Sequence, residues 1–284
     1  MPDFYNIHPY CALAYFAGVI LYSMVFMHPV TVAANVILSF AASISLGGKE
    51  ILASAKYTIF AGIVIAVVNP LFNPAGSTVL FTYFGRNYTY EALVYGIIMG
   101  GIFISSINWF GCMGRVITSD KFMYIFGGRL PTLCLILTMV IGLIPFFQKK
   151  LSEISSAGSL LIKGSSKTRQ AFRALSVATG YTFEHSVNLS VSMKNRGYGT
   201  GKTTRITNYT VKIYDIIFII ITAVLNVTVI CLLSGSAVNI EIIPAINIPV
   251  LKGTGFTGFT VLLALPCIMY LFKELKWLYL KSKI

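Results

Sequence analysis

PTLCLILTMVIGLIPFF, residues 131–147, is the stretch that decides how often this chain crosses a membrane. It is apolar throughout, but it carries Pro131 and Pro145 near its two ends, and the polar sequence QKKLSEISS follows it directly. A membrane-spanning helix needs about 20 mostly apolar residues, and about 17 at the least. The stretch is therefore a marginal span by length, and its position has to be argued from the rest of the sequence.

The composition of the whole chain is that of an integral membrane protein. Of its 284 residues, 56% are hydrophobic and 11% are charged, whereas an average soluble domain has roughly 25% charged residues. The mean hydropathy is +0.78. Further apolar runs fall at about 10–27, 30–46, 55–69, 91–113, 213–233 and 256–272. We therefore expect an all-α protein that passes through the bilayer several times, with membrane lipid as a partner.

The excess of basic residues sets the expected orientation. The chain has 22 Lys and Arg against 9 acids, and in membrane proteins such an excess normally lies in cytoplasmic segments. Residues 149–212 hold 11 of these basic residues against Glu153 and Glu184. The loop before residue 131 is also basic, through Arg115, Lys121 and Arg129. A single crossing between the two regions would separate them, so we expect residues 131–147 to lie along the interface or against other helices.

This assignment predicts six spans with both termini in the cytoplasm, and it divides the chain into three regions. Residues 1–113 are expected to form an N-terminal membrane bundle of four spans, and residues 114–210 a cytoplasmic region. Residues 211–284 are expected to supply two further spans and a basic tail. The segment NPLFNPAGSTVLFTYFGRNYTY, residues 69–90, is expected on the outside.

Two long helices are expected in the cytoplasmic region. One begins at Pro131, since proline suits the first helical position, and ends at about Ala157-Gly158. The other begins near Ser165-Ser166, which are good capping residues, and ends at Arg196-Gly197, where glycine can adopt the left-handed conformation that ends a helix. Both helices are thus expected to stop at a glycine.

The six predicted spans contain no Asp, Glu, Lys, Arg or His deep within them. Ion-coupled carriers usually have such residues at a relay or binding site. The histidines His8, His28 and His185 are dispersed, and neither H-E-x-x-H nor G-x-S-x-G occurs. Asp120 and Lys121 are interpreted as a solvated loop pair. The sequence therefore gives little support to ion coupling or to an intramembrane enzyme.

The five cysteines lie far apart in apolar surroundings and without C-x-x-C spacing: Cys11, Cys112, Cys134, Cys231 and Cys267. We interpret them as small core residues and expect neither a disulfide frame nor a metal site. No cofactor is expected. The basic excess is better explained by membrane orientation than by nucleic-acid binding, so no nucleic-acid partner is expected.

The segment NRGYGTGKTTR, residues 195–205, has the look of a phosphate-binding loop. Such a loop needs a glycine, four residues, and then Gly-Lys-Ser/Thr, so that backbone amides surround the phosphate. The position of that first glycine is occupied by Arg196, and the preceding sequence is helical in character where a strand would be needed. Nucleotide binding by this segment is therefore not expected.

The two long helices and their ends resemble the transmembrane T component of energy-coupling factor (ECF) transporters, the EcfT/CbiQ family, which includes a cobalt-transport permease. Members carry two Ala-Arg-Gly motifs at the ends of two crossed coupling helices, and SVSMKNRGYGTGKTTR is similar to the second motif with its flank. The segments NPLFNPAG, RVITSDKFMYIFG and IGLIPFFQKKLSEI are similar to family stretches in the same order. The place of the first motif reads Ser155-Ser156-Ala157-Gly158, which keeps the glycine but lacks the arginine.

The resemblance implies a non-catalytic subunit of an ATP-driven importer in a prokaryotic cell membrane, with its two coupling helices in the cytoplasm. Its partners would be two ATP-binding cassette ATPase subunits and a small substrate-binding membrane (S) subunit, and the cargo a vitamin or a metal ion. The ATPase-coupling residues implied are Asn195, Arg196 and Gly197, with Ala157 and Gly158 at the first site. Lys202 and Arg205 would contact the rim of an ATPase or acidic lipid.

Other interpretations stay open at the level of sequence. Arg196 would also serve as an ordinary positively charged residue on the cytoplasmic side, with Gly197 as a routine helix cap. The alternative functions are a conventional ABC permease subunit with its own solute path, and, from another class, an ion-coupled carrier or an intramembrane enzyme.

Overall fold

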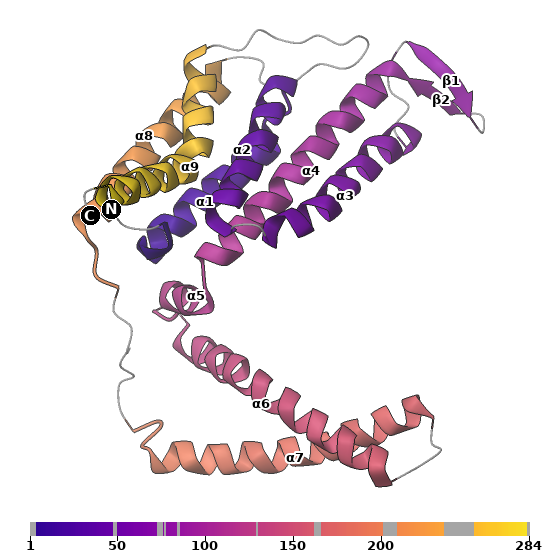
Figure 1. The fold of residues 1–284 in the computed structure, drawn as a ribbon, viewed down its shortest axis with the longest axis vertical. Helices are drawn as coiled ribbons and strands as arrows, with labels where there is room; N and C mark the ends of the chain where they lie inside the picture. Colours follow the sequence, from indigo (N-terminus) through magenta and orange to yellow (C-terminus); the bar gives the residue numbers. More distant parts are fainter. Residues whose placement is uncertain are drawn as a thin grey trace. The chain divides into compact units, whose positions relative to one another are not determined.

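The computed structural model describes residues 4–47, 50–72, 76, 78–83, 86–128, 130–161, 166–200, 209–235 and 253–282. These residues are mostly helical (Figure 1). In chain order the elements are the 3-10 helix η1 (Phe4–Asn6), helices α1 (Pro9–Val25), α2 (Pro29–Gly47) and α3 (Glu50–Phe72), strands β1 (Val79–Tyr83) and β2 (Arg86–Thr89), and helices α4 (Tyr90–Val116), α5 (Ser119–Phe126), α6 (Pro131–Leu161), α7 (Lys167–Asn195), α8 (Ile213–Gly235) and α9 (Gly253–Lys281).

The chain divides into two compact units. The first, which we call the bundle unit, comprises Met1–Phe122 and Tyr209–Ile284. The second, the crossed-helix unit, comprises Met123–Asn208 and contains α6 and α7. It therefore lies within the region 114–210 that the sequence separates from the spans.

Helix α1 supplies several residues to the core of the bundle unit. Its Ala12, Phe16 and Val19 are fully buried, and they belong to a core that also takes Trp109 from α4 and Phe259 from α9. The helix begins at Pro9, directly after the cap residue His8, and ends at Val25 where the chain turns extended. Such a helix, apolar on most of its circumference, is stable in the interior of a bundle.

Helices α3 and α4 approach each other closely because glycines lie where they meet. A Cβ atom added to Gly100 would lie 2.6 Å from the backbone oxygen of Gly62, and one added to Gly96 would lie 2.5 Å from that of Ala66. Gly96 and Gly100 form a small-xxx-small pattern, which allows helix backbones to pack closely in a membrane. Larger residues at these two positions would force the helices apart.

Neutral polar residues join α2 to α4 inside the bundle unit. The side-chain oxygen of Asn35 accepts a hydrogen bond from Trp109 Nε1 at 2.9 Å, and the Asn35 amide donates to Ser105 Oγ at 3.1 Å. One turn further along, the Asn108 amide donates to Ser39 Oγ at 3.3 Å. All five residues are buried. Interhelical hydrogen bonds of this kind fix the register of two apolar helices.

A small β-hairpin precedes α4, and the sequence did not predict it. Strands β1 and β2 pair antiparallel, with an irregularity between Val79 and Phe81. Aromatic and Thr residues in VLFTY and RNYT favour extended structure. Two hydrogen bonds join the hairpin to the helix. The Thr89 hydroxyl accepts a hydrogen bond from the Ala92 backbone amide, and the Glu91 carboxylate accepts one from the Thr78 backbone amide at 3.2 Å. The described structure is thus helical with one two-stranded addition.

Six helices in the described part of the chain are long and apolar enough to cross a membrane: α2, α3, α4, α6, α8 and α9. By length and composition this confirms a multi-pass helical membrane protein. The number agrees with the six predicted spans, but the set differs, because α6 qualifies over Pro131–Gly158 whereas α1, with 17 residues, is shorter. Helix α6 qualifies because it continues as one helix past residue 147, although the apolar stretch itself ends there.

Both connections between the two units begin at polar residues that hold the N-terminal segment. Lys121, in α5, donates from Nζ to the Tyr5 carbonyl at 2.6 Å, and Asp215, in the first turn of α8, accepts the His8 amide at 3.0 Å. The Tyr5 hydroxyl in turn bonds to the Leu46 carbonyl. The interpretation of Asp120 and Lys121 as a solvated pair is therefore wrong for the lysine, which is buried and whose pKa is lowered by that burial.

The cysteines fit the sequence interpretation in part. None of the five, all of which lie in the described residues, forms a disulfide; Cys11 and Cys112 are buried, and Cys134 and Cys267 are half-buried. Cys231 is exposed on α8 and is not a core residue of this chain. Because α8 is apolar enough to span a membrane, an exposed thiol on it is compatible with a lipid environment, where a small, weakly polar side chain costs little.

Candidate functional site

The crossed-helix unit holds the residues that the sequence singles out for coupling. Helix α6 begins at Pro131 as predicted, but it continues to Leu161. The prediction that it stops at Ala157-Gly158 is wrong: Gly158 lies inside the helix. A single glycine costs only about 1 kcal/mol relative to alanine in a helix interior, and the flanking sequence contains no proline to break the helix.

Helices α6 and α7 cross one another (Figure 1), and an aromatic cluster lies at the crossing. The ring of Phe146 lies 4.7 Å from that of His185 and 6.2 Å from that of Tyr181, centroid to centroid. The ammonium group of Lys150 lies 5.2 Å from the centroid of the Tyr181 ring, within range of a cation–π contact. These contacts all join the second half of α6 to the middle of α7.

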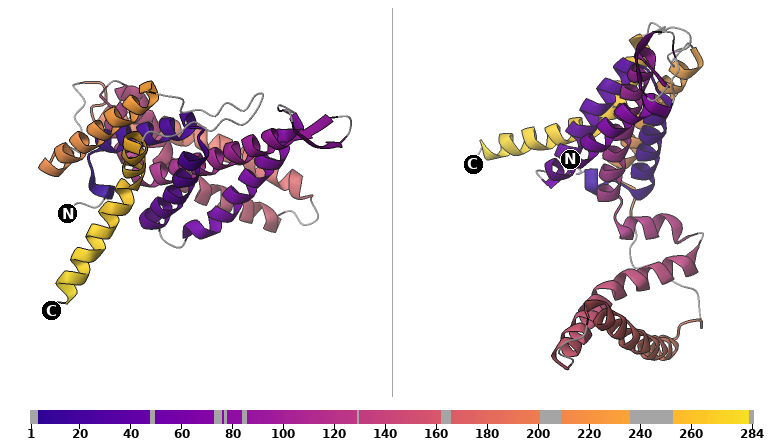
Figure 2. Two further views of the ribbon diagram at one scale, coloured as in Figure 1. Left: turned by 90° about the horizontal axis from the view of Figure 1, so that it is seen from above. Right: turned by 90° about the vertical axis from the view of Figure 1, so that its right-hand side faces the viewer.

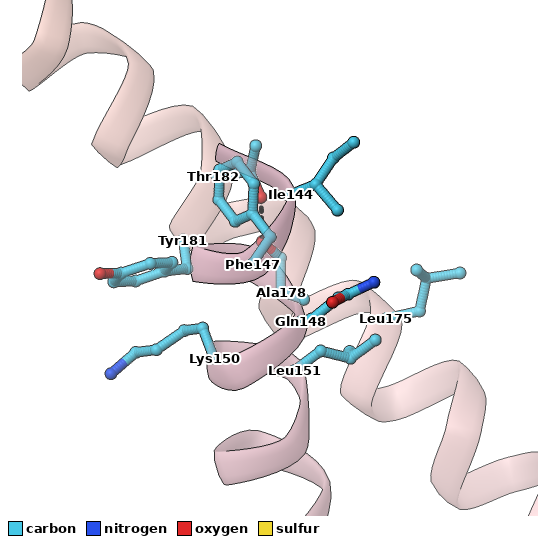
Figure 3. Close-up of a pocket in the computed structure, with 9 residues that line it drawn as sticks. All are labelled: Ile144, Phe147, Gln148, Lys150, Leu151, Leu175, Ala178, Tyr181 and Thr182. Atoms are coloured by element: carbon cyan, nitrogen blue, oxygen red, sulfur yellow. Dashed lines mark hydrogen bonds between the residues drawn. The ribbon is translucent and has the colours of Figure 1, made fainter. Parts of the chain in front are cut away.

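Small residues of α7 allow the close approach at the crossing. Ala174 is the only residue of α7 that is buried in the described structure. A hollow of about 300 Å³ between the two helices, shown in Figure 3, is lined by Ile144, Phe147, Gln148, Lys150, Leu151, Leu175, Ala178, Tyr181 and Thr182. In that view Lys150 and Tyr181 lie on one side of the crossing and Leu175 on the other. The lining is mostly apolar and has no pair of acids or nucleophile with a base.

Ala157 and Gly158 line a second hollow between the same two helices, of about 470 Å³. Its lining residues are Ile154, Ser155, Ala157, Gly158, Gln170, Arg173, Ala174, Ser176 and Val177. A Cβ atom added to Gly158 would meet no atom within 4 Å. Packing among the described residues therefore does not require a glycine here, and the space beside it is open.

The end of α7 agrees closely with the sequence prediction. The helix starts after the cap residue Ser166 and runs from Lys167 to Asn195, with Arg196 as its C-terminal cap. Gly197 is left-handed, with φ of +82°. The Tyr198 amide donates to the Met193 carbonyl at 3.0 Å and the Gly197 amide to the Lys194 carbonyl at 2.9 Å. This pair of bonds is the Schellman motif, which closes a helix and requires a residue such as glycine at that position.

The three residues of the second motif are presented at the surface by this turn. Asn195, Arg196 and Gly197 are all exposed. Gly199 is also left-handed, with φ of +90°, so the chain turns away from the helix axis directly after Arg196. Arg196 is therefore exposed at a helix end, directly before the turn.

The two predicted motif sites are not brought together. Ala157 and Gly158 lie at the crossing, where they line a hollow with Val177, whereas Arg196 follows Val177 by 19 residues. At about 1.5 Å per residue, this places Arg196 roughly 28 Å further along α7. Lys202 and Arg205, expected as rim contacts, lie outside the described residues.

Sequence reasoning missed an apolar stripe on α7. Phe183, Val187 and Val191 recur at intervals of four residues, so they share one face of the helix. They are 69%, 62% and 52% exposed, and the face lies away from Tyr181 and His185, which contact α6. The i, i+4, i+8 spacing was the available signal, and it leads along the helix towards Arg196.

Among the described residues there is no group of three or more His, Cys, Asp or Glu that could hold a metal ion. No family model and no curated protein matches the chain.

Proposed function

We propose that this chain is the membrane-embedded coupling subunit of an ATP-driven importer of the energy-coupling factor type. In this role it binds two ATP-binding cassette ATPases and a small substrate-binding membrane subunit in a prokaryotic cell membrane, and it is not itself an enzyme. The substrate-binding subunit selects the cargo, a vitamin or a metal ion. The observation that carries the proposal is the end of α7, where exposed Arg196 precedes the left-handed Gly197.

The chemistry of this helix end suits docking into a protein groove. Arginine offers a planar fork of donors that matches a carboxylate in two hydrogen bonds. The stripe of Phe183, Val187 and Val191 supplies apolar surface next to that charge. A helix that places an apolar face in a groove, with a charged group at its end, is a recurring mode of protein recognition.

The crossing of α6 and α7 supports a role in transmitting force. Helix α7 has 29 residues, which corresponds to roughly 43 Å, and the aromatic cluster holds it to α6 near its middle. A displacement of the end at Arg196 is therefore passed to α6 if the two helices move as rigid elements. The first motif site contributes differently in this proposal, because Ala157 and Gly158 offer an uncharged helix surface and not a helix end.

The test is co-purification with a matched pair of variants. The complex is isolated in mild detergent from cells that express the chain at its native locus, and its subunits are identified. Arg196→Ala removes the proposed contact, and Arg169→Ala removes an exposed arginine from the other end of the same helix. Truncating one partner of a buried charged pair typically costs about 2–5 kcal/mol, which weakens docking by a factor of roughly 30 to several thousand.

We expect the wild type and Arg169→Ala to retain the ATPases and a small membrane protein, and Arg196→Ala to lose the ATPases. ATP-driven uptake should fall in parallel. Retention of the ATPases by Arg196→Ala, or saturable nucleotide binding by the purified chain alone, would contradict the proposal. Recovery of ATPases without any third membrane protein would favour a conventional ABC permease.

A further inference from the structure

Helix α9 is longer than a bilayer requires. It has 29 residues, or roughly 43 Å of helix, against a hydrocarbon thickness of about 30 Å. Its first 20 residues, 253–272, contain no charged side chain, and charges begin at Lys273. Those 20 residues match the bilayer, so the last nine extend beyond it or lie along its surface.

The end of α9 leaves the other helices of the bundle unit. Leu262, Leu263 and Leu265 of this helix are buried, but every residue from Tyr270 to Ser282 is exposed. Pro266 lies inside the helix, at the place where a helix can bend because a backbone hydrogen bond is missing. In the right-hand view of Figure 2 this last part, in yellow, projects sideways from the bundle towards the C-terminus.

The projecting segment has two faces. Leu271, Leu275 and Leu278 follow the i, i+4, i+7 spacing of an apolar stripe. By the same geometry Lys273 and Lys276 lie on the opposite side of the helix, with Leu280 between them, and Lys281 lies at the edge of the leucine stripe. Glu274 is the only acid between residues 270 and 282. Trp277 lies among the lysines, with the ammonium of Lys281 5.0 Å from its ring centroid. A stripe of leucines, with lysines and a tryptophan around the rest of the circumference, is typical of helices in the plane of a membrane surface.

We propose that residues 270–282 form an interfacial helix that binds anionic lipid headgroups. The leucine face enters the acyl boundary, and the three lysines contact phosphate groups of the same leaflet. Charge complementarity selects this occupant, since a basic face with a single acid matches the negative surface potential of a cytoplasmic leaflet. The site is independent of ATPase docking and holds whether or not Arg196 binds a partner.

The chain provides its own probe for the test. It has two tryptophans, of which Trp109 is fully buried in the bundle and Trp277 is 59% exposed. The signal of Trp277 is the difference between the full-length protein and Trp277→Phe. Its accessibility to acrylamide is measured in detergent, in nanodiscs of phosphatidylcholine, and in nanodiscs in which about a third of the lipid is phosphatidylglycerol.

We expect Trp277 to be shielded in the anionic nanodiscs alone, and added salt to reverse the effect. The triple variant Lys273→Gln, Lys276→Gln, Lys281→Gln should shift the segment towards water by roughly a hundredfold. The control removes three basic residues from the crossed-helix unit through Lys149→Gln, Arg169→Gln and Arg173→Gln, and should keep the shielding.

Three results would overturn the proposal. Equal shielding in neutral and anionic nanodiscs would mean that headgroup charge is not recognised. Shielding in detergent without lipid would mean that protein, such as a second copy of the chain, covers the segment. Shielding that persists in the lysine triple variant would remove the lysines from the contact.

Discussion

Tyr15→Phe should lower the free energy of unfolding by about 1–2 kcal/mol, because it removes the partner of one specific carbonyl group. Pro266 has no N–H and cannot bond to the carbonyl four residues earlier in α9, that of Leu262. The Tyr15 hydroxyl donates to that oxygen at 3.0 Å. Tyr15 and Leu262 are each only 1% exposed, so water does not replace the lost bond.

The magnitude follows from this geometry. An unsatisfied polar group in a protein interior costs about 1–3 kcal/mol, and single hydrogen bonds between membrane helices contribute about 0.6 kcal/mol on average and at most about 1.7. The substitution keeps the aromatic ring, whose centroid lies 5.3 Å from that of Phe16 and 5.6 Å from that of Phe4. The apolar packing therefore changes little. The lost hydrogen bond remains as the main effect, and it changes the equilibrium constant of unfolding by about tenfold.

The assay is a double-mutant cycle with Pro266→Ala, read by denaturant unfolding in mild detergent. The alanine introduced by this substitution supplies an N–H for the Leu262 carbonyl, so Tyr15→Phe should cost much less in that background. Tyr270→Phe, at an exposed position of the same helix, is the control and should change stability little. If Tyr15→Phe costs the same in the wild-type background and in the Pro266→Ala background, the hydroxyl does not compensate for the proline and the argument is refuted.

Two further predictions concern the region where the units are joined. Burial lowers the pKa of Lys121, so between that lowered value and the ordinary lysine pKa of about 10.4 the unfolded chain binds more protons than the folded one, and stability rises with pH. The free energy of unfolding of wild type relative to Lys121→Met should therefore be higher near pH 9.5 than at neutral pH. A difference between the two proteins that does not change with pH would contradict this. In a background without the native cysteines, Asp120→Cys and Ser152→Cys should react with an impermeant maleimide from one side of the membrane and Thr78→Cys from the other, whereas reaction of the first two from opposite sides would make α6 a span.

Local signals in the sequence predicted the ends of α7 well, and α6 shows why the same reasoning fails elsewhere. At Arg196-Gly197 the glycine is followed by a second glycine, and the helix closes there with the left-handed turn. At Gly158 no such context follows, and the cost of one glycine is small compared with the hydrogen bonds of a continuing helix. A glycine alone therefore does not predict a helix end.

Buried polar residues were harder to identify from the sequence. Lys121 was assigned to solvent because its partner is a backbone carbonyl 116 residues away, which the sequence does not indicate. Asn35 and Asn108 were likewise not recognised as joining α2 and α4, since only the fold brings them together. The four-residue spacing of Asn35, Ser39 and Ser43 was a signal for a polar helix face, and all three are buried.

The bonds to the N-terminal segment bear on the side of the membrane at which α6 begins and ends. Lys121 in α5 and Asp215 in α8 both hold residues 5–8, through Tyr5 and His8. The chain therefore leaves the bundle unit and returns to it at one end of that unit. We infer that the segment between begins and ends on the same side of the membrane, which corresponds to an even number of crossings. Of the helices described in this segment, only α6 is long and apolar enough to cross, because α7 is predominantly polar. With α6 as the single candidate, an even number of crossings means that α6 does not cross. This favours the placement of residues 131–147 along the interface or against a partner, as the basic residues on both sides predict.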